Sequence, residues 1–203
     1  MNPAPFVLNE SNPGYLILRE YKNERDGYSL NSIAMNDAIP IMTWRNQQID
    51  ALRQSIPLTS SVQNSYFKKH VETQFDQQKP NPILLRYCLR NQLIGYGGLV
   101  HIDWKERIAE VSFLLETSRT QNLNNYVDEF STFLYLLKNL AFRFLGFQKL
   151  TTEAYAHRKT HVSTIENSGF KREQIIRSTN KVEGKWIDSI LASCENEEYK
   201  RPK

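Results

Sequence analysis

The chain has 203 residues, of which 40% are hydrophobic and 24% are charged. This is an ordinary globular composition, and the length suits one domain with a sizeable core. The 26 basic and 22 acidic residues give a net charge of +4, which is too small and too dispersed to indicate a nucleic-acid partner, although it suits a small anionic ligand.

The N-terminal segment, residues 1–27, is expected to be an arm with an extra strand. The apolar residues at 15–21 and 28–33 predict the two strands of a hairpin. We place the main domain at residues 28–199, and the basic cluster at 200–203 indicates a solvated tail.

Two helices are predicted next. Asn36 or Asp37 is suited to cap the first, which carries Pro40 near its first turn. The second begins near Ser60, whose spacing to Gln63 is that of a capping box.

A hairpin is then expected between residues 83–89 and 93–102. Its turn falls at Arg90-Asn91-Gln92. Glycines in the second strand permit a bulge or the close approach of another backbone; they are Gly95, Gly97 and Gly98.

The most apolar segment, Ile108 to Leu115, predicts a strand covered on both sheet faces. Glu110 and Ser112 interrupt it, and both share a face with Leu114 because strand side chains alternate.

A long amphipathic helix follows, and Asn124 or Asn125 is placed to cap it. Its apolar positions recur every three or four residues; they are Tyr126, Phe130, Phe133, Leu134, Leu137, Leu140, Ala141 and Phe144. The chain turns after Gly146, and residues 149–156 read as a further strand. A crossover of strand, helix and strand makes the two strands parallel.

The C-terminal part predicts a short helix from Arg158 to Asn167, ended by Gly169, and a closing hairpin that turns at Glu183-Gly184. The order of elements indicates an α/β fold, with a mixed sheet and helices on both faces.

These features resemble the GNAT superfamily of N-acetyltransferases. The resemblance rests on four segments taken together; they are Leu93 to Leu99, Ala109 to Leu115, Ala141-Phe142 and Glu166 to Phe170. It implies about seven strands with a central parallel pair, and transfer of an acetyl group from acetyl-CoA to an amine.

The resemblance also implies where acetyl-CoA binds. The pantetheine arm would lie where strands 108–115 and 149–156 separate, and the pyrophosphate would meet backbone N–H groups at the start of the long helix. The residues expected at this cofactor site are Phe113, Leu114, Leu115, Arg119, Asn124, Asn125, Tyr126 and Arg158.

Two positions differ from the family pattern. The glycine-rich phosphate turn of the family is replaced by Ser118 to Asn125, which contains no glycine. Arg119 could add a bidentate phosphate contact. The tyrosine that often protonates the leaving thiolate is replaced by Ile165, and His161 stands where a small residue is common.

Glu110 is the candidate catalytic base, because an amine must lose a proton before it attacks a thioester and a carboxylate can take that proton. The alternative is that Glu110 reaches solvent or pairs with a lysine. His161 is the second catalytic candidate; with His157 it could instead be a surface or capping residue. No third ligand accompanies these histidines, so no metal site is expected.

The triplet Trp44-Arg45-Asn46 resembles members that acetylate amino sugars on nucleotide carriers. With Tyr155 it forms the expected acceptor site, and Arg45 would meet a phosphate. Trp44 and Tyr155 could equally be core residues, and Arg45 could lie on a solvated face.

The predicted acceptor is thus a small-molecule primary amine. A peptide acetyltransferase and a non-catalytic acyl-CoA-binding relative stay open, and so does a homodimer. Only Cys88 and Cys194 are present, no N-terminal signal is visible, and no run approaches the about 20 apolar residues that span a bilayer. We therefore expect a cytoplasmic protein without a membrane partner.

Overall fold

The computed structural model describes residues 14–182 and 185–197. Most of the N-terminal arm, the turn at Glu183-Gly184 and the tail at 200–203 lie outside these residues.

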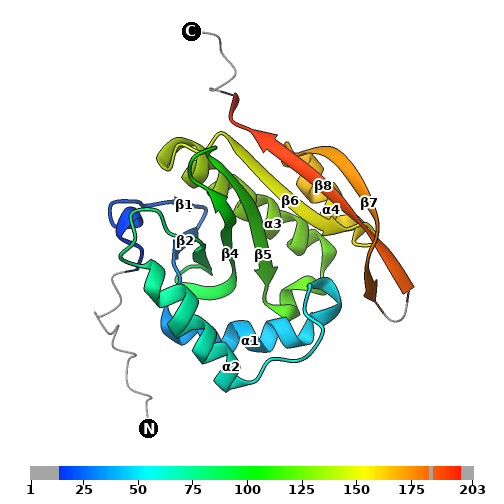
Figure 1. The fold of residues 1–203 in the computed structure, drawn as a ribbon, viewed down its shortest axis with the longest axis horizontal. Helices are drawn as coiled ribbons and strands as arrows, with labels where there is room; N and C mark the ends of the chain where they lie inside the picture. The colour runs from blue at the N-terminus through cyan, green and yellow to red at the C-terminus, as the bar shows by residue number, and fades with distance from the viewer. Residues whose placement is uncertain (1–13, 183–184, 198–203) are drawn as a thin grey trace.

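Within the described residues, the fold is an eight-stranded mixed sheet with helices packed against it (Figure 1). The strands are β1 Glu24–Arg25, β2 Tyr28–Ser32, β3 Ile83–Leu89, β4 Gln92–Asp103, β5 Ile108–Leu115, β6 Lys149–Tyr155, β7 Lys171–Val182 and β8 Lys185–Glu195. Their order across the sheet is β1-β2-β3-β4-β5-β6-β8-β7. β5 and β6 are parallel, and the other neighbours are antiparallel. The predicted mixed sheet with a central parallel pair is confirmed, with eight strands instead of about seven.

Two pairs of helices lie on opposite sides of the sheet. They are α1 Ala38–Gln47 and α2 Ser60–Tyr66 on one side, and α3 Leu123–Lys138 and α4 Lys159–Asn167 on the other. Short 3-10 turns cover Leu16–Leu18, Met35–Asp37, Ile49–Ala51, Glu72–Gln74 and Thr117–Thr120, and π-helical turns extend α2 over Phe67–Val71 and α3 over Asn139–Phe144. No helix in the described ranges is long and apolar enough to cross a membrane.

α3 forms where the apolar periodicity predicts it, but its cap, Asn122, lies two or three residues earlier than the expected Asn124 or Asn125. The Asn122 side chain accepts hydrogen bonds from the backbone N–H groups of Asn124 and Asn125. Asparagine serves here because its side-chain oxygen satisfies amides that have no partner inside the helix. Similarly, α2 is capped by Thr59, which accepts from Val62 N, and not by Ser60.

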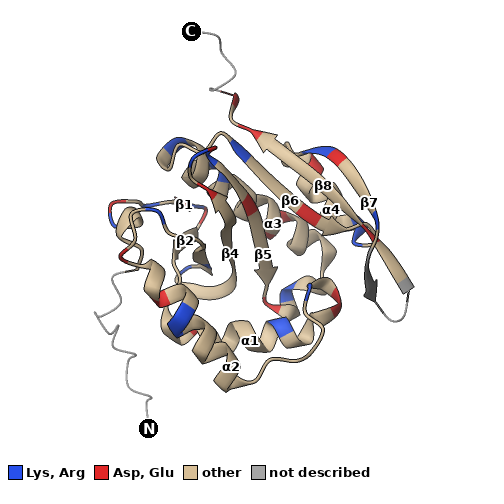
Figure 2. Cartoon of the chain, viewed as in Figure 1, with Lys and Arg blue, Asp and Glu red and all other residues tan. Residues whose placement is uncertain are grey.

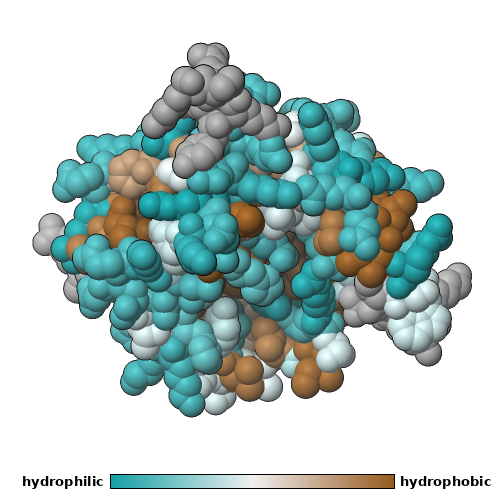
Figure 3. Space-filling model, turned by 45° about the horizontal axis from the view of Figure 1, so that its top comes forward, coloured by the Kyte–Doolittle hydropathy of each residue, from teal (hydrophilic) through white to brown (hydrophobic). Residues whose placement is uncertain are grey.

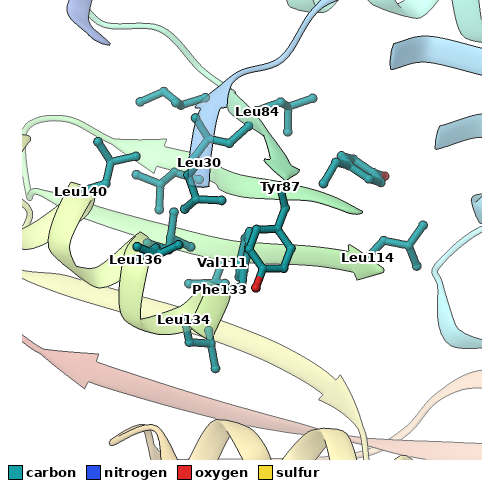
Figure 4. Close-up of a cluster of buried hydrophobic side chains, with 14 of the residues drawn as sticks. Leu30, Leu84, Tyr87, Val111, Leu114, Phe133, Leu134, Leu136 and Leu140 are labelled. Carbon is teal, nitrogen blue, oxygen red and sulfur yellow. The ribbon is translucent and has the colours of Figure 1, made fainter. Parts of the chain in front are cut away.

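The side of α3 that faces the sheet builds the main core. Figure 4 shows Leu30, Tyr87 and Val111 of the strands packed against Phe133 and other apolar side chains of α3. Gly97 permits this close packing, because a Cβ atom there would collide with the Phe133 ring and with the Ser112 carbonyl oxygen. The predicted role of the β4 glycines in close approach is thus confirmed at Gly97.

The predicted first strand at residues 15–21 is wrong. This segment contains the short turn Leu16–Leu18. The strand that precedes β2 and pairs with it is β1, which has two residues, Glu24–Arg25. Tyr15 is fully buried, and its hydroxyl accepts a hydrogen bond from Leu84 N. The apolar residues of the segment therefore fill the core instead of extending the sheet edge.

Candidate active site

The parallel strands β5 and β6 separate soon after they begin to pair. Their register runs from Ile108 and Lys149 to Glu110 and Thr151, and no further pairs follow among these fully described strands. A cavity of about 250 Å³ lies at the separation. Its walls carry Ser112 from one face of β5 and Phe113 from the other, so the cavity passes between the two sides of the sheet.

Six of the predicted site residues line this cavity together; they are Arg45, Glu110, Phe113, Leu114, Arg158 and His161. The sequence analysis missed several others there, among them Arg53, Tyr96, Ser112, Phe130, Thr152 and Glu153. The polar residues of β6 were the available signal, because Glu153 lies two positions after the partner of Glu110 and therefore shares its face.

Glu110 borders the cavity and is partly accessible to solvent. Its Oε2 atom lies 3.0 Å from Nδ1 of His101, and its side chain is 26% exposed. The alternative interpretation had Glu110 reach solvent or pair with a lysine; the side chain does reach solvent in part, and its partner is a histidine. His101 takes a positive φ of 48° next to an irregularity in β4 between Val100 and Asp103, which lies directly beside Glu110.

A second carboxylate, that of Glu153, lines the same cavity and forms an ion pair with Arg53. Figure 2 shows acidic residues on both β5 and β6. The two carboxylates differ in their partners, since Glu153 faces a permanent cation and Glu110 faces a group that is charged only when protonated.

The imidazole of His161 lies on the α3 side, in contact with Tyr126 and Phe130. Its Nδ1 atom is 2.6 Å from the Tyr126 hydroxyl, and its ring stacks on Phe130 at 4.5 Å between centroids. Arg158 donates a longer hydrogen bond, of 3.4 Å, to the same hydroxyl. Burial, reinforced by the positive charge of Arg158, holds the pKa of His161 well below its usual value, so the imidazole is neutral.

The tautomer of the neutral imidazole follows from the direction of the Tyr126 contact. When the Tyr126 hydroxyl accepts from Arg158 and donates to Nδ1 of His161, the ring proton is carried by Nε2. Burial also raises the pKa of Tyr126, against the opposing charge of Arg158, so the phenol keeps its proton.

The family model of the acetyltransferase (GNAT) domain matches residues 30–191. The chain belongs to this family. It is an N-acetyltransferase with the mixed sheet of the GNAT fold.

Solved structures agree with this fold at low sequence identity. The structure of mutant forms of the spermidine/spermine N-acetyltransferase SpeG from Vibrio cholerae gives a TM-score of 0.71 at 15% identity. The match covers 86% of this chain and 97% of that one. A GNAT-family acetyltransferase from Bacillus anthracis gives 0.67 at 11% identity, with 86% and 98% covered. A GCN5-related N-acetyltransferase from Brucella melitensis gives 0.64 at 16% identity, with 86% and 78% covered. A comparison with curated proteins found no match.

At the start of α3, where this GNAT domain is expected to meet the pyrophosphate, the candidate phosphate-binding groups already have partners within the chain. The amides of Asn124 and Asn125 are bonded to the Asn122 side chain. Arg119 forms ion pairs with Glu129 and Glu116. A phosphate at this helix end would therefore compete with contacts that the chain itself supplies.

The four residues expected at the acceptor site of the GNAT domain do not line one common cavity. Trp44 is packed in the core, and Asn46 holds the following loop through the backbone N–H and carbonyl of Leu58. Tyr155 donates a hydrogen bond to the Leu52 carbonyl and is buried. Of these four residues, only Arg45 lines the cavity, where it donates to Tyr96 and Gln54.

A second cavity, of about 300 Å³, lies between α1, α2 and the sheet. It shares Arg45, Tyr96 and Ser112 with the first cavity. The Ser112 hydroxyl is buried and has no hydrogen-bond partner in the described part of the chain. The two cavities therefore meet beside an unsatisfied hydroxyl, two residues from Glu110.

Proposed function

We propose that this GNAT domain transfers the acetyl group of acetyl-CoA to the primary amine of a small molecule. The observation that carries the proposal is the cavity at the separation of β5 and β6, which brings a carboxylate, Glu110, and a neutral imidazole, His161, to one site. Family membership supports the class of reaction.

The residues of the chain suit acetyl-CoA in two places. Apolar side chains of Val111, Phe113 and Phe130 line the cavity between the strands and would accept the pantetheine arm. The exposed start of α3, with the positive end of the helix dipole, would accept the pyrophosphate once the Asn122 cap yields. When bound, acetyl-CoA would supply the thioester that acetylates the amine.

Glu110 would act as the base. An amine attacks only as the free base, so its extra proton must go to a nearby acceptor. The carboxylate of Glu110 lines the cavity and can take that proton at Oε2 or Oε1. The neighbouring His101 is 70% exposed and can pass it on to solvent.

His161, on the α3 side of the sheet, would act as a hydrogen-bond donor to the leaving thiolate. In the tautomer in which Tyr126 donates to Nδ1, the Nε2–H group would donate into the cavity that the ring lines. A donor fixed in advance stabilises negative charge as it develops, because no reorganisation is needed at the moment of reaction. This role would replace the tyrosine whose position is taken by Ile165.

The test is a screen of amine acceptors that measures release of the CoA thiol. We expect release with at least one small primary amine, and a loss of that release in Glu110→Gln. Absence of release with every amine, in protein that binds acetyl-CoA, would favour the non-catalytic alternative. Acetylation only of peptide N-termini would favour the peptide alternative.

An amino sugar on a nucleotide carrier is one finer prediction for the acceptor, and it competes with the apolar amine argued for below. Arg45 is the residue that would meet its phosphate, because this cation borders both cavities. Spermidine belongs in the screen as well, since the similar SpeG structures are of a spermidine/spermine N-acetyltransferase. A cytoplasmic location, suggested by the presence of only two cysteines, and a homodimer also stay predictions.

A further inference from the structure

We infer, resting on the proposed acetyl transfer, that the acceptor is a small primary amine with an uncharged apolar body, alkyl or aryl, held in the second cavity. The amine group would lie where this cavity meets the first one, beside Ser112.

The second cavity is lined mainly by apolar side chains from α1, α2 and the sheet. Ile41, Leu58, Phe67, Leu84 and Val100 are among them. A cavity of about 300 Å³ is at the lower end of the range for ligand pockets, about 300–1,000 Å³. It therefore suits a small apolar body better than a nucleotide-linked sugar.

The charges of this cavity disfavour a polycation. Among the described residues that line it there is no aspartate or glutamate, and the one charged side chain is the cation Arg45. An ammonium group in such a site would lose its hydration without gaining a counter-ion. A polyamine that carries several ammonium groups would meet this cost directly.

The same environment favours the reactive form of an amine. Apolar surroundings and a nearby cation both lower the pKa of a bound amine, so the free base is preferred. The free base is the form that attacks a thioester. Binding in this cavity would thus raise the fraction of the amine that is already unprotonated, so fewer amines would need Glu110 to remove a proton.

Ser112 supplies an orienting contact at the junction of the two cavities. Its buried hydroxyl has no partner in the described chain, and a buried polar group without a partner is costly unless a ligand satisfies it. An amine N–H could donate to this oxygen, with the nitrogen directed to the first cavity. Glu110 lies on the same face of β5, two residues away.

The cavity can be reached from the surface along α2. Val62 and Tyr66 line it, yet they are 53% and 41% exposed. The face of the molecule in Figure 3 is mainly hydrophilic, with hydrophobic side chains in separate patches. Half-exposed apolar residues at a cavity mouth therefore mark an entrance for an apolar ligand.

The reaction balances without a further reagent. The amine nitrogen forms a bond to the acetyl carbon, the bond from that carbon to sulfur breaks, and one proton leaves the nitrogen. The products are an amide and the CoA thiol, which carries that proton.

The first experiment compares kcat/KM for hexylamine, phenethylamine, spermidine, glucosamine and a nucleotide-linked amino sugar, measured by release of the CoA thiol. We expect the two apolar amines to exceed each polar acceptor roughly tenfold or more, because burying an unpaired charge or an unpaired hydroxyl group costs at least about 1.4 kcal/mol. Equal or higher kcat/KM for spermidine or either sugar would overturn the inference and leave the proposed function intact. No release with any acceptor would overturn both.

The second experiment changes the entrance. Val62→Asp places a carboxylate at the mouth of the cavity, in the first turn of α2 where helices tolerate negative charge. The ratio of kcat/KM for phenethylamine to that for spermidine should fall roughly tenfold. Ile175→Asp is the matched control, since Ile175 is also β-branched, is 44% exposed and lies on β7 outside both cavities. The assignment of this cavity would be overturned if the ratio fell equally in both variants, or if it stayed unchanged in both.

Discussion

The carboxylate of Glu110 lies in a mainly apolar strand, beside His101 and against the cavity between β5 and β6. Its position two residues from the unsatisfied Ser112 hydroxyl places a proton acceptor where the two cavities meet. The function of the site therefore depends on whether this carboxylate acts as a base or only stabilises the strand through His101.

Replacing Glu110 by glutamine separates these roles. Glu110→Gln keeps the shape and hydrogen-bonding reach but removes basicity, so turnover should fall roughly 10²–10⁴-fold while acetyl-CoA affinity changes little. Higher pH should partly restore the rate, because more of the amine is then unprotonated. Steady-state kinetics from pH 7 to 9 provide the measurement.

The control for this experiment is His101→Gln, which removes the partner and keeps the carboxylate. A structural role of the pair predicts similar losses of melting temperature in both variants and no rescue by pH. Full activity of Glu110→Gln would remove this residue from the mechanism and direct attention to His161.

The buried imidazole of His161 predicts a pH dependence of stability. Its pKa is lowered by burial and by Arg158, so between the folded pKa and the ordinary value of 6.5 the unfolded chain binds the extra proton and the folded chain does not. Stability from this group is complete above about pH 6.5 and decreases as the pH falls, by at most about 1.4 kcal/mol per pH unit.

The variant His161→Gln should lose less stability on acidification, because glutamine does not titrate. Urea unfolding at pH 7.5 and at pH 5 measures the difference, and effects of other groups cancel between the two proteins. Parallel losses in both would show that the imidazole accepts a proton in the folded protein.

At the level of the elements, the start of α3 joins stability to cofactor binding. Arg119 pairs with Glu129, whose side chain is only 6% exposed, and with Glu116. Burial raises the pKa of Glu129, and Arg119 opposes this increase. The same arginine is the predicted phosphate ligand.

Removing Arg119 should therefore have two effects. Arg119→Ala should lower the free energy of unfolding by about 2 kcal/mol, because a buried carboxylate loses its partner. It should also weaken binding of CoA more than that of pantetheine fragments without the pyrophosphate. Urea unfolding and calorimetric titrations measure these effects.

Addition of Glu129→Gln to the Arg119→Ala variant provides the control, since it removes the buried charge and should restore part of the stability. If CoA and its fragments lose affinity equally, Arg119 has no contact with the phosphate, and its role is to hold α3 through Glu129.

At the scale of the whole molecule, acetyl-CoA should stabilise the fold. A ligand that binds only the folded state adds about 2.7 kcal/mol at a concentration 100 times its Kd, which for a chain of this length raises the melting temperature by roughly 5–10 °C. Thermal unfolding with and without acetyl-CoA measures this change. No shift at millimolar acetyl-CoA, together with no heat of binding, would contradict the proposed donor.

The main elements of the fold could be predicted from local patterns. The apolar run of β5, the stripe of α3 and the hairpin of β3 and β4 all lie where periodicity and turn residues place them. Failures occurred where local pattern and tertiary packing disagree. The apolar residues near Tyr15 have the composition of a strand, yet Tyr15 and Leu18 are buried in the core, where the Tyr15 hydroxyl accepts a hydrogen bond from Leu84 N.

By itself, the sequence determined the mixed sheet, the parallel crossover and the presence of Glu110 and His161, because these depend on side-chain alternation and helical periods that are local along the chain. Only the tertiary structure decided the partners of the site. Tyr126 meets His161 across 35 positions, and Arg53 meets Glu153 across 100. Such pairs depend on how far β5 and β6 stay paired and on where α1 and α3 pack, and no local pattern encodes either of these.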